Sequence, residues 1–539
     1  MQQEVLLQLS PKDAAQSAVI SENIAHELGI DARRITGFHF IKKSIDARKR
    51  NVLINLKLRA FVDEPFHATT LPPFEFPDVS KAEKITLVIG AGPAGLFAAL
   101  ELIQLGIKPI VIERGKDVRE RRRDLAALNR DGILNEDSNY CFGEGGAGTY
   151  SDGKLYTRST KRGNVEKVLQ LLVHFGADPA ILYTAHPHIG TNKLPGIIQN
   201  IRQQIIDAGG EVHFNEKLID FNIVNQQIQS VVCASGNRFD GNNIILATGH
   251  SAKDIYVLLH QKQILIEAKP FALGVRIEHP QSLIDSIQYH CPTTLGRDEF
   301  LPPASYQLVE QVNGRGVFSF CMCPGGIIAT ASTVQKELVV NGWSPSKRNN
   351  PFANSGMVVQ VELADMMKGT RDKGRGTRDE GQGMSLLLHH FQESVERRAY
   401  EAGGGHFVAP AQRMTDFVKG KSSSTLPENS YLRGVVPVNM KEVLPDFVFE
   451  SLQGAFKAFG KKMKGYFTEE AIIIAPESRT SSPVRIPRDP ETLQHPQIKN
   501  LYPCAEGAGY AGGIVSAAMD GQRVANHLSI FSAADNFSM

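Results

Sequence analysis

The fold is decided by a stretch that begins as an apolar strand and ends as a glycine turn: Ile85-Thr86-Leu87-Val88-Ile89-Gly90-Ala91-Gly92-Pro93-Ala94-Gly95. The continuous apolar run at its start is typical of a strand buried on both faces of a parallel sheet. The turn has the G-x-G-x-x-G spacing, and the residues after it, as far as Leu105, predict a helix. Strand, turn and helix together predict the opening of a doubly wound α/β domain.

Each glycine of this turn has its own physical role. Gly90 permits the tight turn, Gly92 lets the backbone approach a pyrophosphate, and Gly95 lets the helix pack close to the strand. Pro93 suits the first helical turn, where its missing N–H is no loss. The diphosphate would lie on the exposed N–H groups at the helix start, next to Ala94, and at the positive end of the helix dipole.

An acidic residue follows at the distance that a dinucleotide site requires. A second buried strand, Pro109 to Ile112, ends at Glu113, 18 positions after Gly95. The Glu113 carboxylate can accept hydrogen bonds from both ribose hydroxyls. It also argues against an adenosine with a 2′-phosphate, because like charges repel. A plain strand-turn-helix junction without a ligand would not need all these features in register.

The same glycine spacing occurs twice more, in different contexts. Gly143 to Gly148 follows no buried strand, and the near P-loop that continues to Lys154 has Leu155 where Ser or Thr must meet magnesium. A phosphotransferase is therefore disfavoured, and we expect a loop that lies against a large planar cofactor or its phosphates. Gly507 to Gly512 precedes a helix, but only 27 residues remain after it, too few for a second ribose-binding strand.

Composition narrows the class of protein. The 539 residues are 42% hydrophobic and 22% charged, which is ordinary globular usage. The net charge of +2 gives no indication of nucleic acid or an anionic membrane as the main partner. Six cysteines in so long a chain fit a reducing compartment. With no readable secretory signal and no apolar run long enough for a membrane span, we expect a cytoplasmic protein.

The chain divides into four predicted segments. Residues 1–80 form a small N-terminal β-α-β-β module that ends in a proline-rich linker, and residues 81–270 form the first part of the nucleotide domain. Residues 271–475 are an inserted α+β domain, and residues 476–539 return to the nucleotide domain. Within the insert, Asn313-Gly314 between two apolar runs predicts a hairpin, because both turn positions need positive φ.

Several motifs resemble the FAD-binding fold of the glutathione-reductase type, in its branch without a second nucleotide domain. Gly90 to Gly95 with Glu113 resembles the half that binds ADP, and Ile244 to Gly249 resembles the A-T-G motif near the middle of the cofactor. Tyr502 to Gly507 resembles the distal motif, with Glu506 in place of the usual Asp. Further stretches are similar to a family of uncharacterised bacterial FAD-dependent dehydrogenases over most of the chain: residues 142–155, 186–194, 270–279, 320–326 and 477–483.

The resemblance implies FAD as the cofactor, held in a Rossmann-like FAD-binding domain. It implies that Gly145, Gly146 and Lys154 lie near the flavin, and that the N–H groups of Gly513 and Ile514 face its pyrimidine edge. The predicted cofactor-binding residues are Gly90, Gly92, Pro93, Ala94, Gly95, Glu113, Arg114, Gly145, Gly146, Lys154, Leu218, Ala247, Gly249, Glu506, Gly513 and Ile514. Among them, Leu218 resembles the position whose backbone pairs with adenine.

The candidate catalytic residues are Lys154, Cys321, Cys323 and Arg479. In a strand the C-x-C spacing puts both thiols on one face, where one of them could meet the flavin. Redox enzymes of this fold use other cysteine spacings, so we favour the interpretation that both cysteines are small buried residues. Arg479 could clamp a substrate carboxylate or anchor the crossover back from the inserted domain, and both remain open.

Two other polar clusters are predicted to have mainly structural roles. His186-Pro187-His188 lacks a third and fourth ligand at metal-site spacing, so no metal site is predicted. The basic cluster of Arg119, Arg121, Arg122 and Arg123 predicts mostly a solvated helix face, with one member able to reach the cofactor's diphosphate.

The predicted function is that of a FAD-dependent oxidoreductase of the dehydrogenase type. Hydride would pass between the flavin and a small substrate held between the flavin and the inserted domain. Without a second dinucleotide motif, NAD(P)H would have to bind transiently in the same cleft, or the substrate itself would reduce the flavin. The alternatives are a FAD-binding sensor or assembly protein without turnover, and a FAD-dependent monooxygenase.

Overall fold

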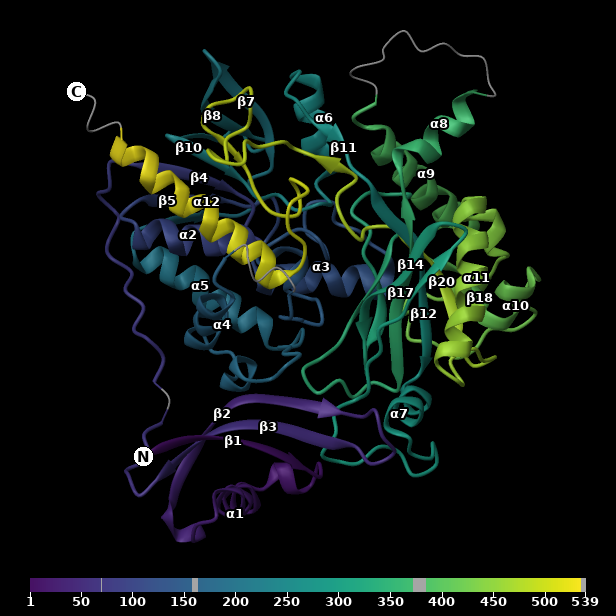
Figure 1. Cartoon of the computed structure of the whole chain (residues 1–539). Helices are drawn as coiled ribbons and strands as arrows, with labels where there is room; N and C mark the ends of the chain where they lie inside the picture. The colour runs from purple at the N-terminus through teal and green to yellow at the C-terminus, as the bar shows by residue number, and fades with distance from the viewer. Residues whose placement is uncertain (69, 158–162, 372–383, 535–539) are drawn as a thin grey trace.

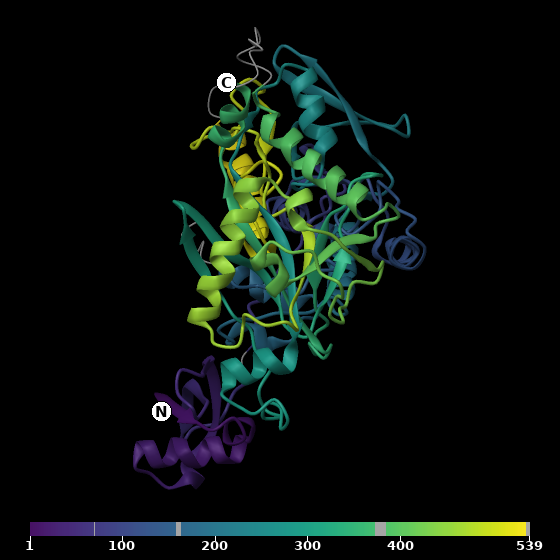
Figure 2. The ribbon, with the colours of Figure 1, turned by 90° about the vertical axis from the view of Figure 1, so that its right-hand side faces the viewer.

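A computed structural model describes the chain except for residues 69, 158–162, 372–383 and 535–539. The N-terminal module is a three-stranded antiparallel sheet in the order β1-β3-β2, with one helix packed on it. Its elements are β1 (Gln2–Leu9), α1 (Ser17–Leu28), β2 (Ile35–Asp46) and β3 (Leu53–Val62). The predicted β-α-β-β order is confirmed, and the module projects from one end of the molecule (Figure 2).

A five-stranded sheet with every strand parallel forms the core of the next part, in the order β22-β10-β4-β5-β6. Its strands are β4 (Ile85–Ile89), β5 (Lys108–Ile112), β6 (Glu211–His213), β10 (Asn243–Leu246) and β22 (Leu501–Pro503). Because β22 pairs with β10, the last part of the chain returns to the first sheet, as the sequence predicts.

Helices and a small meander cover this sheet. On one side α2 (Pro93–Gln104) packs against α12 (Ile514–Ala534) and α5 (Leu194–Asp207) (Figure 1). The remaining elements of this part are α3 (Val118–Asp131), α4 (Val165–His174), β7 (Leu218–Val224), β8 (Gln227–Cys233), β9 (Arg238–Asp240) and α6 (Lys253–Gln261). The strands β7, β8 and β9 form a separate antiparallel sheet. This arrangement leaves the carboxyl ends of the parallel strands to form one wall of a cavity.

A seven-stranded sheet dominates the rest, in the order β13-β14-β17-β12-β20-β18-β19. Its strands are β12 (Phe271–Pro280), β13 (Val309–Val312), β14 (Arg315–Cys323), β17 (Phe352–Val361), β18 (Ala409–Arg413), β19 (Val435–Pro437) and β20 (Ile472–Glu477). In the central strand β12 every residue except Pro280 is buried, so both faces of this sheet are covered.

Helices cover the outer face of the seven-stranded sheet, and a two-stranded ribbon lies on the side of the nucleotide part (Figure 1). The ribbon is β15 (Ile327–Thr330) with β16 (Val340–Trp343), and the short strands β11 (Glu267–Ala268) and β21 (Val484–Arg485) pair where the chain enters and leaves this part. The helices are α7 (Gln281–Tyr289), α8 (Leu363–Arg371), α9 (Leu387–Ala402), α10 (Met414–Lys419) and α11 (Asp446–Lys462).

Two local features of β14 matter for the site. The predicted hairpin is confirmed: Asn313 and Gly314 have φ of 51° and 77°, and Val312 pairs with Arg315. Farther along, the pairing of β14 with β17 shifts register between Phe320 and Cys323. Cys321 lies in this irregularity with φ of 45°, a left-handed conformation that is uncommon for residues other than glycine. No helix among the described residues is long and apolar enough to cross a membrane.

Candidate functional site

A large cavity lies between the carboxyl ends of the parallel strands and the seven-stranded sheet. It spans about 1490 Å³ when its open mouth is counted. Its nucleotide wall consists of the β4–α2 turn, the end of β5, and segments within residues 141–154, 216–218, 247–255 and 505–517. Its opposite wall consists of Phe320, Cys321, Asn341 and Arg479. The cavity is therefore large enough for an extended ligand.

The structure brings most of the predicted cofactor-binding residues to this cavity. Fourteen of the sixteen line it, and the exceptions are Gly95 and Gly145. A Cβ atom on Gly95 would lie 1.9 Å from the carbonyl oxygen of Gly90, and one on Gly145 would lie 2.1 Å from Thr149 Oγ1. These two glycines permit close packing behind the cavity wall, while the contacts of the others with a cofactor stay predictions.

Gly92 differs from its two neighbours in the turn. Its φ of −77° is accessible to any residue, and a Cβ atom there would meet nothing closer than Gly146 Cα, at 3.9 Å. Gly90, in contrast, has φ of 105° and lies against the carbonyl oxygen of Ala247. Gly90 is therefore required by the backbone conformation of the turn, whereas the absence of a side chain at Gly92 keeps space open in the cavity.

Glu113 lies at the end of β5 and organises the loops around it. Its carboxylate accepts hydrogen bonds from the backbone N–H groups of Ala91 (2.8 Å), Gly115 (2.9 Å) and Gly143 (2.9 Å). A carboxylate offers about four acceptor positions, so the buried Glu113 has one left for a ribose hydroxyl. The sequence prediction concerned only the ribose, and it did not foresee that this side chain joins both glycine loops.

Arg121 is the exception in the basic cluster: Arg119, Arg122 and Arg123 are exposed, as predicted for a solvated helix face, whereas the Arg121 side chain is fully buried. Its guanidinium donates to four backbone carbonyl oxygens at 2.8–3.0 Å, those of Asn139, Tyr140, Glu144 and Gly146. The loop of residues 139–146 folds over α3 and needs these donors for its inward-facing carbonyls. The signal was present in the sequence, since Arg121 shares one face of the helix with Val118, Leu125 and Leu128.

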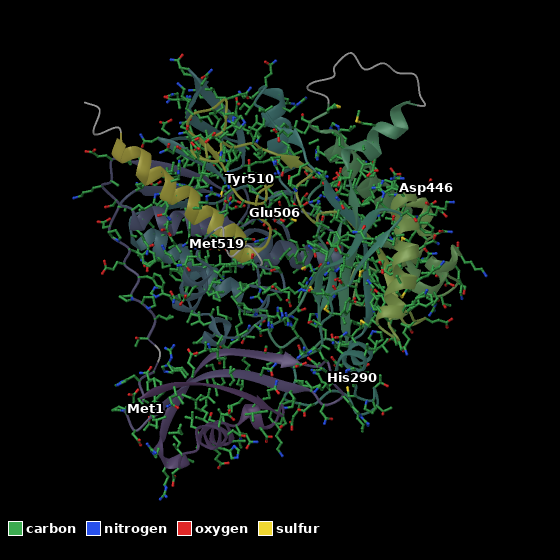
Figure 3. All side chains as sticks on the ribbon, in the orientation of Figure 1. Met1, His290, Asp446, Glu506, Tyr510 and Met519 are labelled. Carbon is green, nitrogen blue, oxygen red and sulfur yellow. The ribbon has the colours of Figure 1, made fainter. Side chains whose placement is uncertain are left out.

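His250 and Glu506 form a pair that the sequence did not reveal. His250 Nδ1 lies 3.0 Å from Glu506 Oε2, and both residues line the cavity. Glu506 lies between α12 and the seven-stranded sheet in the view of Figure 3. His250 follows directly after the predicted A-T-G motif, so its proximity to the cavity could have been read from that motif.

Of the two candidate thiols, only Cys321 lines the cavity, and Cys323 is buried behind it. The irregularity in β14 means that the alternation expected for C-x-C in a regular strand does not apply, and Cys323 Sγ donates to the carbonyl oxygen of Cys321 at 3.3 Å. A hydrogen bond from Cys323, with the charges of Lys154 and Arg276, holds the pKa of the Cys321 thiol well below its usual range. Lys154 itself donates to the carbonyl oxygen of Met322.

Arg479 binds a carboxylate of the protein itself. Its Nε and Nη2 atoms donate to Glu396 at 3.2 and 3.1 Å, and Nη1 donates to Thr333 at 2.7 Å. Lys253 shares the buried Glu396 at 2.8 Å and also binds Glu337. These contacts join the end of β20 to α9 and to α6 of the nucleotide part, as the anchoring alternative predicts. Because Arg479 also lines the cavity, its role as a clamp for a substrate carboxylate stays a prediction.

A second buried pair lies beside this network. Arg276 Nη1 donates to Glu477 Oε2 at 2.7 Å and to Asn341 Oδ1 at 3.2 Å. Its Nε donates to Asn354 and its Nη2 to the carbonyl oxygen of Cys321. Burial raises the pKa of Glu477 to about 7, against the opposing influence of Arg276. The wall opposite the nucleotide loops is thus built from neutralised pairs of charged side chains.

The histidines of the HPH stretch have structural contacts. His188 Nε2 lies 3.1 Å from the carbonyl oxygen of Ser346, and the His186 ring packs edge-on against Tyr156. Elsewhere in the described part of the chain, His389, His390 and Glu393 on α9 place ligand atoms within 4.8 Å of one another. Lys253 Nζ lies 3.7 Å from Glu393, so this carboxylate already has a cation beside it.

Comparison with known proteins gives three family matches. Residues 270–480 match a family described as FAD-dependent protein, C-terminal domain-like, and residues 83–128 match a FAD binding domain. Residues 1–61 match a domain of unknown function. An uncharacterized protein of Clostridium beijerinckii is 39% identical over 531 residues, which covers 95% of this chain and 95% of that one.

Solved structures give only distant similarity. A structure of CtdE in complex with FAD is 8% identical, with a TM-score of 0.33 over 83% of this chain and 84% of that one. The halogenase PltM is 11% identical, with a TM-score of 0.37 over 84% of this chain and 70% of that one. Scores below 0.5 do not establish a common fold.

Proposed function

The chain belongs to a family of FAD-dependent proteins that includes the Clostridium protein, and from that premise we propose that it is an oxidoreductase that transfers hydride between FAD and a small substrate. The observation that carries the proposal is the continuity of the cavity, which joins the glycine loops of the nucleotide wall to polar side chains of the opposite wall. A dinucleotide bound along the first wall would have its far end beside the second.

FAD is the cofactor, and the residues of the cavity fit it. The hydroxyls of Thr248 and Ser251 line the cavity, are buried, and have no hydrogen-bond partner among the described residues. Buried polar atoms of this kind normally have a partner, which a polar cofactor can supply. A Cβ atom would meet nothing within 4 Å at Gly249, and at Gly513 only Ser516 Oγ, at 3.8 Å. Gly92, Gly249 and Gly513 therefore offer backbone N–H groups that would hold the cofactor.

The helices add favourable electrostatics. α2 begins at Pro93 and α12 begins at Ile514, and both of these residues line the cavity. The N-terminus of a helix carries partial positive charge and free N–H groups, which suit a diphosphate or an electron-rich ring edge. Lys154 adds a cation on the same side.

FAD supplies the two-electron chemistry when it is bound, and the chain must bind the substrate and move the proton. His250 is the residue that we assign to the proton. Glu506 Oε2 lies 3.0 Å from Nδ1, which leaves Nε2 to take or give a proton. The paired carboxylate fixes the orientation of the ring.

The test is anaerobic reduction of the purified protein. We expect yellow protein with FAD in stoichiometric amount, whose flavin absorption bleaches with NADH or NADPH and returns with an organic acceptor. Oxygen uptake coupled to NADPH oxidation would instead identify a monooxygenase. A flavin that stays oxidised with every donor would overturn the proposal in favour of a sensor, and protein that binds no FAD would overturn it altogether.

A glycine variant tests where the cofactor lies. Gly92→Ala adds a methyl group that touches no protein atom within 3.9 Å, so the fold should be unaffected while FAD affinity falls by about tenfold or more. Gly196→Ala is the matched control, because Gly196 lies in α5 and a Cβ atom there meets nothing within 4 Å. Equal FAD affinity in both variants would place the cofactor elsewhere.

A further inference from the structure

A smaller inner chamber adjoins the large cavity on the side of the seven-stranded sheet. It spans about 520 Å³ when its open side is counted, and six of its lining residues also line the large cavity: Cys141, Ala147, Ser151, His250, Asn341 and Arg479. The others are Tyr140, Tyr150, Ala329, Ala331, Val339, Gly342, Trp343 and Glu477. The chamber is therefore continuous with the cavity and lies between the loop of residues 140–151 and the ribbon of β15 and β16, where a bound FAD would leave room for a second, small molecule.

Aromatic rings and small side chains shape the chamber. Tyr140 and Tyr150 come from the loop after α3 and face each other edge to face, with ring centroids 6.4 Å apart. Trp343 comes from β16 on the opposite side. Alanine and glycine at Ala147, Ala329, Ala331 and Gly342 leave the space between these rings open. Walls of this kind suit a planar ring, which gains edge-to-face or stacked contacts beyond simple burial.

One end of the chamber offers hydrogen-bond donors. A guanidinium has five N–H donors, and three of those of Arg479 are used by Glu396 and Thr333, which leaves two. Glu396 and Thr333 hold the group rigidly, so these donors are preorganised. Asn341 adds an amide NH₂, because its Oδ1 already accepts from Arg276. This end suits a carbonyl or carboxylate oxygen.

From this geometry we propose that the inner chamber is the substrate subsite, and that it binds one planar aromatic ring that carries a carbonyl or carboxylate oxygen directed at Arg479. The inference rests on the proposed function, because it names the class of molecule that meets the flavin. Two sources share this chemistry: a free aromatic acid or ketone, and the carboxamide-bearing ring of a nicotinamide nucleotide. His250 lines both spaces, so a ring in the chamber lies beside the residue assigned to the proton.

The chain contains a built-in reporter for the test, since Trp343 is its only tryptophan. The FAD-loaded protein is titrated with benzoate, nicotinamide and cyclohexanecarboxylate, with Trp343 fluorescence and the flavin absorption spectrum as readouts. We expect saturable changes with benzoate or nicotinamide, and binding of cyclohexanecarboxylate about tenfold weaker. A response to benzoate alone indicates an aromatic acid, and a response to nicotinamide alone indicates the nucleotide.

Two variants localise the binding. Ala329 lines the chamber but not the large cavity, so Ala329→Leu should abolish the response while FAD content stays at the wild-type level. Tyr140→Leu removes one ring without adding volume. It should lower the affinity for the aromatic probes to that for cyclohexanecarboxylate. Melting temperature and FAD content report whether each variant is folded.

The outcomes separate the inference from the proposed function. The protein could bind FAD and be reduced, yet show no response to the probes or the same response in Ala329→Leu. This result would overturn the proposed substrate subsite and would leave the proposed oxidoreductase function standing. Protein that responds to the probes but holds an unreactive flavin supports the chamber and overturns the oxidoreductase. If no FAD is retained, the same titration of Trp343 fluorescence without cofactor decides the chamber alone.

Discussion

The two walls of the cavity differ in the chemical groups that form them. The nucleotide wall presents backbone N–H groups from short glycine-rich turns at the ends of parallel strands, with Glu113 joining the turns through three backbone hydrogen bonds. The opposite wall presents charged side chains that neutralise one another, Arg276 with Glu477 and Arg479 with Glu396. The first wall depends on the absence of side chains, and the second depends on side chains brought together from distant strands.

Because of this difference, substitutions in the two walls should have different effects. A change on the nucleotide wall adds atoms where space is required, so the cofactor and the local packing suffer first. A change on the opposite wall removes one partner of a buried pair and leaves an uncompensated charge, so the stability of the whole domain suffers first. The predictions below test this contrast, beginning with the largest effect.

Arg276→Met should be the most damaging single change. It leaves Glu477 without its cation and Asn354 Oδ1 without its donor, and it removes one hydrogen bond each to Asn341 and the Cys321 carbonyl, so we expect a loss of about 3–5 kcal/mol in the free energy of unfolding. Urea unfolding measures it. The double variant Arg276→Met/Glu477→Leu should recover most of the loss, because two apolar groups replace the pair. A double variant as unstable as the single one would contradict the role given to the charge.

Gly95→Ala should have the next largest effect, on the nucleotide wall. The added Cβ atom would lie 1.9 Å from the Gly90 carbonyl oxygen, so α2 must move away from the turn. We expect a loss of about 3 kcal/mol, the upper end for overpacking, together with loss of FAD. Flavin absorbance after gel filtration and a thermal melt measure the two effects. Gly196→Ala, in open space on α5, is the control and should be neutral or stabilising.

The same contrast explains how much the sequence could predict. Gly90, Gly92 and Glu113 were readable because their requirements are local: a turn, a close approach and a strand end, all within one βαβ unit. Arg276 and Glu477 lie 201 positions apart and meet only because β12 pairs with β20. No local spacing encodes that meeting, so the ionic wall and the chamber behind it had no sequence signal.

Arg121 and Cys321 mark intermediate cases. Arg121 shares the buried face of α3 with Val118 and Leu125, a periodicity visible in the sequence, but a run of arginines normally indicates solvent. Cys321 was interpreted through the alternation of a regular strand, and the irregularity in β14 cancels that alternation. In both cases a tertiary contact overrode a sound local expectation.

Glu278→Gln should change the pH dependence of stability. Burial raises the pKa of the Glu278 carboxyl from its usual 4.5 to about 7, although Ser430 donates hydrogen bonds to it. The stability contributed by the protonated form is therefore complete below pH 4.5 and is lost as the pH rises through about 7. Glutamine cannot ionise, so the variant should avoid about 2 kcal/mol of this loss. Urea unfolding at pH 5 and pH 8 measures it, and an unchanged difference between the two pH values would refute it.

The smallest expected effect lies outside both walls, where the N-terminal module meets the rest of the chain. Phe40 on β2 stacks on Tyr183 with ring centroids 4.9 Å apart, and Lys43 exchanges backbone hydrogen bonds with Tyr183 and Ala185. At the far end of β2, His290 Nε2 lies 3.1 Å from the carbonyl oxygen of Ala47; His290 is labelled in Figure 3. The docking therefore includes a stacked aromatic pair and several hydrogen bonds to the backbone.

Phe40→Ala removes the stacked pair and keeps the backbone bonds, so we expect the docking to weaken by about 1 kcal/mol. Because the module contributes nothing to the cavity lining, FAD content should stay at the wild-type level. Limited proteolysis measures the effect as faster cleavage in the linker of residues 63–84. Tyr183→Phe keeps the ring and should behave as wild type. If Phe40→Ala lowered FAD affinity instead, the N-terminal module would be coupled to the nucleotide wall. FAD binding would then depend on a region outside both walls of the cavity.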